Sequence, residues 1–215
     1  MLTLPVMGEM SMNKAIHGAF RRDLGRFVAA LETFPAGDRK RAAGLGAAWE
    51  NFDDQLVHHH EGEHEIAWPA LEAVGVSREL LVQMDAEHET MAAALAGARK
   101  AMERLTSTAA AEDAAAALVA MAELRRVTVQ HLEHEEAEIE PIYQEKQGSP
   151  EIKAMGRKFA QVSPARGGRF FAWATDGADR EELAAITGTV PPPVLKVITG
   201  VFGRGYRKNI APVWR

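Results

Sequence analysis

Two stretches of this sequence resemble each other and decide its fold. Residues 58–71 read HHHEGEHEIAWPAL, and residues 131–143 read HLEHEEAEIEPIY. Each copy holds the pattern His-x-x-x-Glu, in which the glutamate lies six residues before a proline. This self-similarity indicates an internal repeat. At an offset of 72 residues, the paired positions are His59 with His131, Glu63 with Glu135, and Pro69 with Pro141.

A further histidine precedes each copy at nearly the same distance. His17 lies 42 residues before His59, and His88 lies 43 residues before His131. Each half of the repeat is therefore expected to be a helix with one histidine, followed by a helix with His-x-x-x-Glu.

The first 150 residues have the composition of long helices. Ala, Leu, Glu, Met and Arg dominate there, and β-branched residues are sparse, which favours helix. Capping residues, Pro and Gly set the expected boundaries. Long helices with short links predict an all-α fold, an antiparallel up-down four-helix bundle. The predicted helices run from about Glu9 to Phe34, from Asp38 to about Trp68, from a cap at Ser77, and from the region Ser107–Glu112 to about Lys146.

The spacing within each copy suits a metal site. Four residues advance a helix by about 400°, so His59 and Glu63 project from one face, one turn apart. His131 and Glu135 are spaced in the same way. A third ligand in each half would come from His17 or His88. Two facing sets of this kind predict two metal ions, and these donors suit iron, with manganese or zinc as the less favoured alternatives.

Simpler interpretations of these residues account for the pattern less well. A lone histidine is most often a surface or hydrogen-bonded residue, but six residues of suitable type at matched offsets are hard to obtain by accident. Ferritin-like di-iron proteins use Glu-x-x-His twice. Here that motif occurs once, at Glu61 to His64, and Asp85 with His88 is only a near match.

The repeated pattern resembles the hemerythrin-like, or HHE cation-binding, domain over roughly residues 10–147. The resemblance implies a hemerythrin-like bundle that holds a non-haem di-iron centre with carboxylate bridges. It implies that Glu63 and Glu135 bridge the irons. It also implies four terminal ligands, namely His17, His59, His88 and His131.

The sequence departs from the oxygen-carrying members of that family. Those members have a third-helix His-x-x-x-His, whereas Met84 stands four residues before His88 here. They also tend to use His-x4-Asp in the last helix, where this chain has Glu135 and Glu136. The four-histidine arrangement is more similar to the iron-sensing F-box variant. One further ligand is left open, with His60 favoured over His64, His134, Asp85, Glu87 and Glu136.

The chain is expected to divide at residue 148. Residues 1–148 would form the bundle, and residues 149–215 a basic helical extension packed on it. Residues 1–150 hold 25 acidic and 14 basic residues, whereas residues 151–215 hold 5 and 11. An apolar stripe in the extension must pack on the bundle or bind a protein partner or second copy. Its members are Val194, Leu195, Val197, Ile198, Val201 and Phe202.

Composition also limits the function. The chain has no cysteine, which excludes thiolate metal sites and disulfides. We expect a cytoplasmic protein without nucleic-acid or membrane partners, because the acidic body, the absence of a long apolar run and the N-terminal residues favour that. The favoured function is binding or sensing of oxygen, peroxide, nitric oxide or iron. The alternatives are an iron-dependent peroxide-decomposing or oxidase-type enzyme, and an interaction module with a structural metal. Tyr143 is a candidate hydrogen-bond donor to a bound ligand.

Overall fold

This computed structural model describes residues 10–215, and every regular element in that range is helical. The all-α prediction is confirmed. The long helices are α1 (Met12–Glu32), α2 (Arg39–Gly62), α4 (Arg78–Thr108) and α5 (Ala111–Glu138). The shorter elements are η1 (Glu63–Ala67), α3 (Trp68–Ala73), α6 (Glu140–Lys146), α7 (Pro150–Phe159), α8 (Pro164–Ala174), α9 (Arg180–Thr189), α10 (Pro192–Val201), α11 (Arg204–Asn209) and η2 (Ala211–Trp214).

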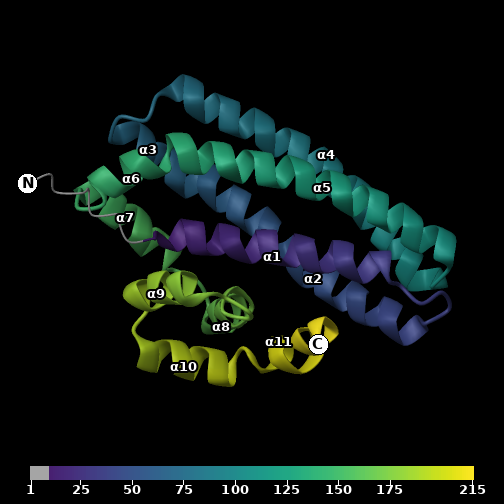
Figure 1. Ribbon diagram of the computed structural model, residues 1–215. Coiled ribbons are helices and arrows are strands. Elements are labelled where there is room, and N and C mark those ends of the chain that lie inside the picture. The colour runs from purple at the N-terminus through teal and green to yellow at the C-terminus, as the bar shows by residue number, and fades with distance from the viewer. Residues whose placement is uncertain (1–9) are drawn as a thin grey trace, which may run out of the picture.

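The four long helices lie along a common direction and form one bundle (Figure 1). Helix α1 packs against α2 and α5, and α4 packs against the same two helices. Their inward faces share one apolar core. Burying side chains of this kind stabilises the fold by roughly 1.5–3 kcal/mol each. Large residues of this core with at most 5% exposure include Phe20, Leu24, Phe27, Leu45, Phe52, Leu56, Met91, Leu95, Met102 and Met121.

Most predicted helix starts agree with the structure. Asp38 accepts a hydrogen bond from the Arg41 backbone N–H at 2.8 Å and caps α2. Ser77 caps α4 in the same way through Leu80, and α5 begins at Ala111, within the predicted region. The predicted start of the first helix, Glu9, lies outside the described residues.

One predicted helix end is wrong, and another predicted helix, whose expected end near Lys146 agrees with the structure, contains a break; a proline lies beside each. The second helical segment continues through η1 and α3 to Ala73 instead of ending near Trp68. The fourth is broken at Ile139, where α5 ends and α6 begins. Pro69 and Pro141 each lie in the first turn of the next helix. Proline is tolerated at that position because no N–H is required there, so a proline marks a restart rather than an end.

Among the C-terminal elements, α8 and α9 pack against α1 (Figure 1), and η2 packs against α2. Trp173 of α8 is 1% exposed, and its Nε1–H donates to Asp23 of α1 at 2.8 Å. Arg22 pairs with Glu182 of α9 at 2.8 Å. Gly168 permits the close approach of α8 and α10, because a Cβ at that position would lie 2.6 Å from the Ile198 carbonyl oxygen.

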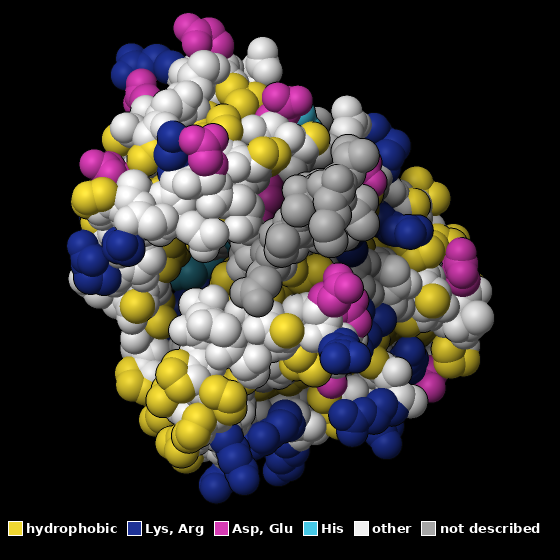
Figure 2. Space-filling model, turned by 60° about the vertical axis from the view of Figure 1, so that its left-hand side comes forward, with side chains coloured by type: hydrophobic (Ala, Val, Ile, Leu, Met, Phe, Trp, Pro, Cys, Tyr) yellow, Lys and Arg dark blue, Asp and Glu magenta, His cyan; other side chains and the backbone are white. Residues whose placement is uncertain are grey.

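The apolar stripe of α10 is only partly covered. Leu195 packs at the edge of the core, and α10 rests on α8. Exposed apolar side chains gather at the lower left of Figure 2, beside basic side chains. On α10, Val194, Val197 and Val201 are 49%, 62% and 50% exposed. A partner at this stripe stays a prediction. No single helix within residues 10–215 is both long and apolar enough to cross a membrane, and α9 with α10 pass that test only as a pair bent by 98°.

Trp173→Ala is expected to destabilise the protein by about 3–5 kcal/mol, because a large buried ring is lost and Asp23 loses a hydrogen-bond donor. Urea unfolding measures this effect. Val119→Ala is the control, since Val119 is 72% exposed and should change stability by less than about 0.5 kcal/mol. If the two variants have equal free energies of unfolding, the contact between Trp173 and Asp23 does not stabilise the packing of α8 on α1.

Candidate metal centre

The structure brings the seven predicted site residues into two adjoining groups. In each group, the potential ligand atoms all lie within 4.8 Å of one another. Glu63 belongs to both groups, so a single carboxylate lies between them. Their role as metal ligands stays a prediction. The first group consists of His60, Glu63, His88 and His131, and the second consists of His17, His59, Glu63 and Glu135.

Glu63 occupies a special position in the backbone. It is the first residue of the π-helix η1, in which its carbonyl accepts from the Trp68 N–H five residues later. Such single wide turns inside α-helices frequently occur at functional sites. The backbone before this turn is α-helical, so His59 and Glu63 share one face. The His59 Nε2 atom lies 3.0 Å from Glu63 Oε1. No sequence signal beyond the nearby Pro69 pointed to this wide turn.

Most of the atoms that face one another in these groups lack hydrogen bonds; the exception is the contact between the Nε2 atoms of His88 and His131, which lie 3.0 Å apart. A buried polar atom without a partner costs on the order of 1–3 kcal/mol, and more when it is charged. So many unpaired donors and acceptors at one place fit a bound cation, because a cation would satisfy the nitrogen lone pairs and carboxylate oxygens together. The unpaired buried atoms are Nε2 of His17, His59 and His60, both oxygens of Glu63, and Oε2 of Glu135.

Carboxylates behind the site orient two of the rings. Glu136 lies 2.9 Å from His17 Nδ1, and Glu87 lies 2.8 Å from His131 Nδ1. A ring that donates its Nδ1–H to a carboxylate keeps the Nε2 lone pair free for a metal. Glu136 is held in turn by Arg21 at 2.6 Å.

The structure distinguishes the six candidates for a further ligand by their positions. Among the six candidates, His60 is the one that joins a ligand group. The other candidates lie behind the groups, where they contact ligand residues or one another. Glu87 contacts His131 and Glu136 contacts His17. His134 contacts Glu87 at 2.7 Å, and Asp85 lies between His64 and the Trp68 Nε1–H.

The placement of Glu135 differs from that of Glu63. Glu135 belongs to the second group alone. Its Oε1 accepts a hydrogen bond from Asn13 at 3.0 Å, and its Oε2 lies 3.2 Å from His17 Nε2. Only one oxygen of Glu135 therefore faces the other donors, whereas both oxygens of Glu63 face donors. A bridging role for Glu135 stays a prediction.

Apolar and aromatic groups surround the donors. Phe20 packs on His59 with ring centroids 5.2 Å apart, and Trp68 stacks on His88 at 5.9 Å. Trp68 continues into a second apolar cluster at this end of the bundle, together with Ile139 and Ile142. Tyr143 packs in the same cluster, and its contact with a bound ligand stays a prediction.

The charges of the site favour cation binding. Burial lowers the pKa of His60 well below its usual value, with help from His88, and burial also lowers the pKa of His131. Both rings are therefore neutral near pH 7, as a ligand must be. Burial would raise the pKa of Glu63, but His59 and neighbouring histidines hold it well below the usual value. His17 differs: burial opposes its charge, yet Glu135 and Glu136 raise its pKa to about 9.

The protein without metal is expected to lose stability as the pH rises from 6.5 to about 9. A histidine whose pKa is raised by folding contributes fully below its unfolded pKa, and the contribution disappears as the pH passes the folded value. His17→Gln keeps a polar side chain but carries no charge, so this loss should be absent. Urea unfolding of chelator-treated protein at about pH 6 and about pH 10 tests the prediction. The same pH dependence in both proteins would contradict it.

The fold and the site together define a class: a helical bundle with buried His and Glu donors arranged for cations. The family model of the Hemerythrin HHE cation binding domain matches residues 11–143, and the chain belongs to this family. The predicted resemblance is thereby confirmed. Comparisons with curated proteins and with solved structures gave no match.

Glu87→Ala is expected to lower metal affinity by about 10–100-fold, because His131 loses the partner that orients its ring. Competition with a chelator of known affinity measures this change. Glu103→Ala is the matched control, since Glu103 is an exposed residue of the same helix. Equal affinities for the two variants would exclude an orienting role for Glu87.

Proposed function

We propose that this protein is a non-haem di-iron protein that binds or senses oxygen, peroxide, nitric oxide or iron. The observation that carries the proposal is that two groups of four donors share Glu63. In this proposal, the long helices form the antiparallel up-down bundle of the family. The first iron is held by His60, His88 and His131, the second by His17, His59 and Glu135, and Glu63 joins them.

Donor chemistry supports iron over the alternatives. Imidazole nitrogen with carboxylate oxygen suits iron and manganese, whereas zinc is satisfied by four ligands in a closed tetrahedron. A reduced iron pair with open coordination positions supplies the capacity to bind oxygen, peroxide or nitric oxide. Glu87 holds the ring of His131 in place, and Glu136 holds the ring of His17. Phe20 and Trp68 keep water away from the rings that they cover.

Binding or sensing is favoured over the interaction module by the position of the extension. Its helices α8 and α9 pack on α1, and Trp173 is buried there. An extension that served mainly to recruit a partner would be expected to lie away from the bundle.

Absorption spectroscopy of the iron-loaded protein tests the proposal. The oxidised form should absorb in the near ultraviolet, as an oxo-bridged ferric pair does. After reduction, oxygen or nitric oxide should change the spectrum, and removal of the gas should reverse the change. An iron-loaded protein whose spectrum responds to neither gas nor peroxide would contradict ligand binding and leave only the sensing of iron, and a protein that takes up no iron would contradict the proposal as a whole. Sustained oxygen release from added peroxide would assign the enzymatic alternative instead.

A further inference from the structure

A slot of about 290 Å³ between α2 and α4 leads to one side of the metal centre. Of the seven residues in the two groups, His60 and His88 line this slot. Their rings are stacked with centroids 4.1 Å apart. By contrast, His17, Glu63, His131 and Glu135 are each at most 4% exposed. The slot therefore adjoins the first group, at its less buried edge.

The inner part of the slot is apolar. Leu56, Met91 and Leu95 line it and are at most 5% exposed. No charged side chain lies among these inner residues, so entering them would cost an ion its hydration. A small uncharged molecule loses no such hydration energy when it enters.

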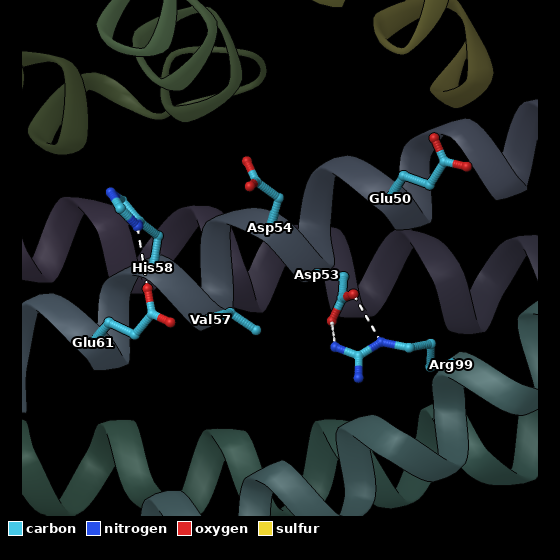
Figure 3. A pocket seen from close by; sticks show the side chains of 7 residues that line it. All are labelled: Glu50, Asp53, Asp54, Val57, His58, Glu61 and Arg99. Carbon is cyan, nitrogen blue, oxygen red and sulfur yellow. Dashed lines mark hydrogen bonds and ion pairs between the residues drawn. The ribbon is translucent and has the colours of Figure 1, made fainter. Parts of the chain in front are cut away.

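The outer part of the slot is acidic. Glu61 and Glu89 are exposed residues of its rim. A shallow surface pocket shares Val57 and Glu61 with the slot and adds the carboxylates of Glu50, Asp53 and Asp54 (Figure 3). Arg99 pairs with Asp53 at 2.6 Å, Arg166 and Arg169 pair with Asp54 at 3.3 and 2.5 Å, and His58 lies 3.4 Å from Glu61. The negative charge of the entrance therefore rests mainly on Glu50, Glu61 and Glu89. Negative charge around an entrance lowers the local concentration of anions and slows their arrival.

We infer that this slot is the route by which an external ligand reaches the iron held by His60, His88 and His131, and that it selects small uncharged molecules over anions. The slot would admit nitric oxide, oxygen and hydrogen peroxide, which are uncharged, and would disfavour azide, which is an anion. The inference rests on the proposed di-iron function and adds the route and the charge of the ligand.

The route is tested by blocking the entrance. Ala92 lies at the exposed end of the slot, so Ala92→Trp should fill it without disturbing the core. Ala93→Trp is the matched control, because Ala93 is the next residue, is also exposed, and does not line the slot. Stopped-flow mixing of reduced iron-loaded protein with nitric oxide measures the rate. Ala92→Trp should slow binding by about tenfold or more, with unchanged iron content, melting temperature and final extent of binding.

The selection is tested by removing charge from the rim. Glu61→Gln with Glu89→Gln should speed azide binding to the oxidised protein by about tenfold and leave nitric oxide binding unchanged. The control is Glu79→Gln with Glu103→Gln, which alters net charge equally at exposed positions of α4 away from the slot. An equal effect of both pairs on azide would overturn the selection.

The outcomes separate the inference from the function on which it rests. If Ala92→Trp and Ala93→Trp bind nitric oxide at the same rate as the unaltered protein, the route is wrong and the di-iron function stands. If the unaltered iron-loaded protein binds neither nitric oxide nor azide, the binding of external ligands proposed for the iron pair fails and the route fails with it.

Discussion

Combining His59→Ala with His131→Ala is expected to give a protein that retains no stoichiometric metal and unfolds at a lower temperature. The two histidines belong to different groups, so each group loses one nitrogen donor. Both side chains are largely buried, and their loss also leaves carboxylates without partners. Metal-binding energy contributes to folding energy and amounts to about 10–16 kcal/mol for structural zinc peptides. Elemental analysis and thermal unfolding with and without chelator measure both effects.

His58→Ala is the control for this experiment. His58 is adjacent to His59, but it belongs to neither group, and its side chain is 51% exposed. We expect wild-type metal content and a stability change below about 0.5 kcal/mol. Stoichiometric metal in the double variant would refute the assignment of the site.

Glu63→Ala should remove metal from both groups, whereas Glu135→Ala should affect mainly one. Glu63 presents both oxygens, one 3.0 Å from His59 and the other 3.4 Å from His88. Glu135 presents one oxygen, to His17. Metal content per chain measures the difference: Glu63→Ala is expected to hold almost none, and Glu135→Ala about half of the wild-type amount. Equal losses for the two variants would instead support the bridging role that the resemblance implied for Glu135.

Much of the fold could be predicted from sequence because its signals are local. Caps such as Asp38 and Ser77 fix helix starts within one turn, and their chemistry does not depend on distant residues. The end predicted near Trp68 is wrong, and the break before Pro141 is not predicted. A proline can stop a helix or begin the next one, and the neighbouring chain decides between these outcomes.

The site could be predicted in part for a similar reason. The repeat gives the spacing of His59 with Glu63, which a helix converts into a shared face. Which residues stand behind the donors depends on packing between helices. Glu87 reaches His131 from another helix, and Glu136 reaches His17. The sequence shows only that these carboxylates are near a motif, so the choice among His60 and its competitors required the three-dimensional arrangement.

The extension illustrates the limit of pattern reasoning. The stripe on α10 predicted a surface that must be covered, yet Val197 is 62% exposed while Leu195 packs at the core edge. Periodicity indicates which residues share a face, but it does not identify what that face contacts.

Metal analysis of the purified protein, combined with its visible spectrum, tests the central claim most directly. Two groups that share Glu63 predict close to two iron ions per chain, together with the near-ultraviolet absorption of a bridged ferric pair. Zinc alone, or a single ion per chain after loading with excess iron, would contradict the account.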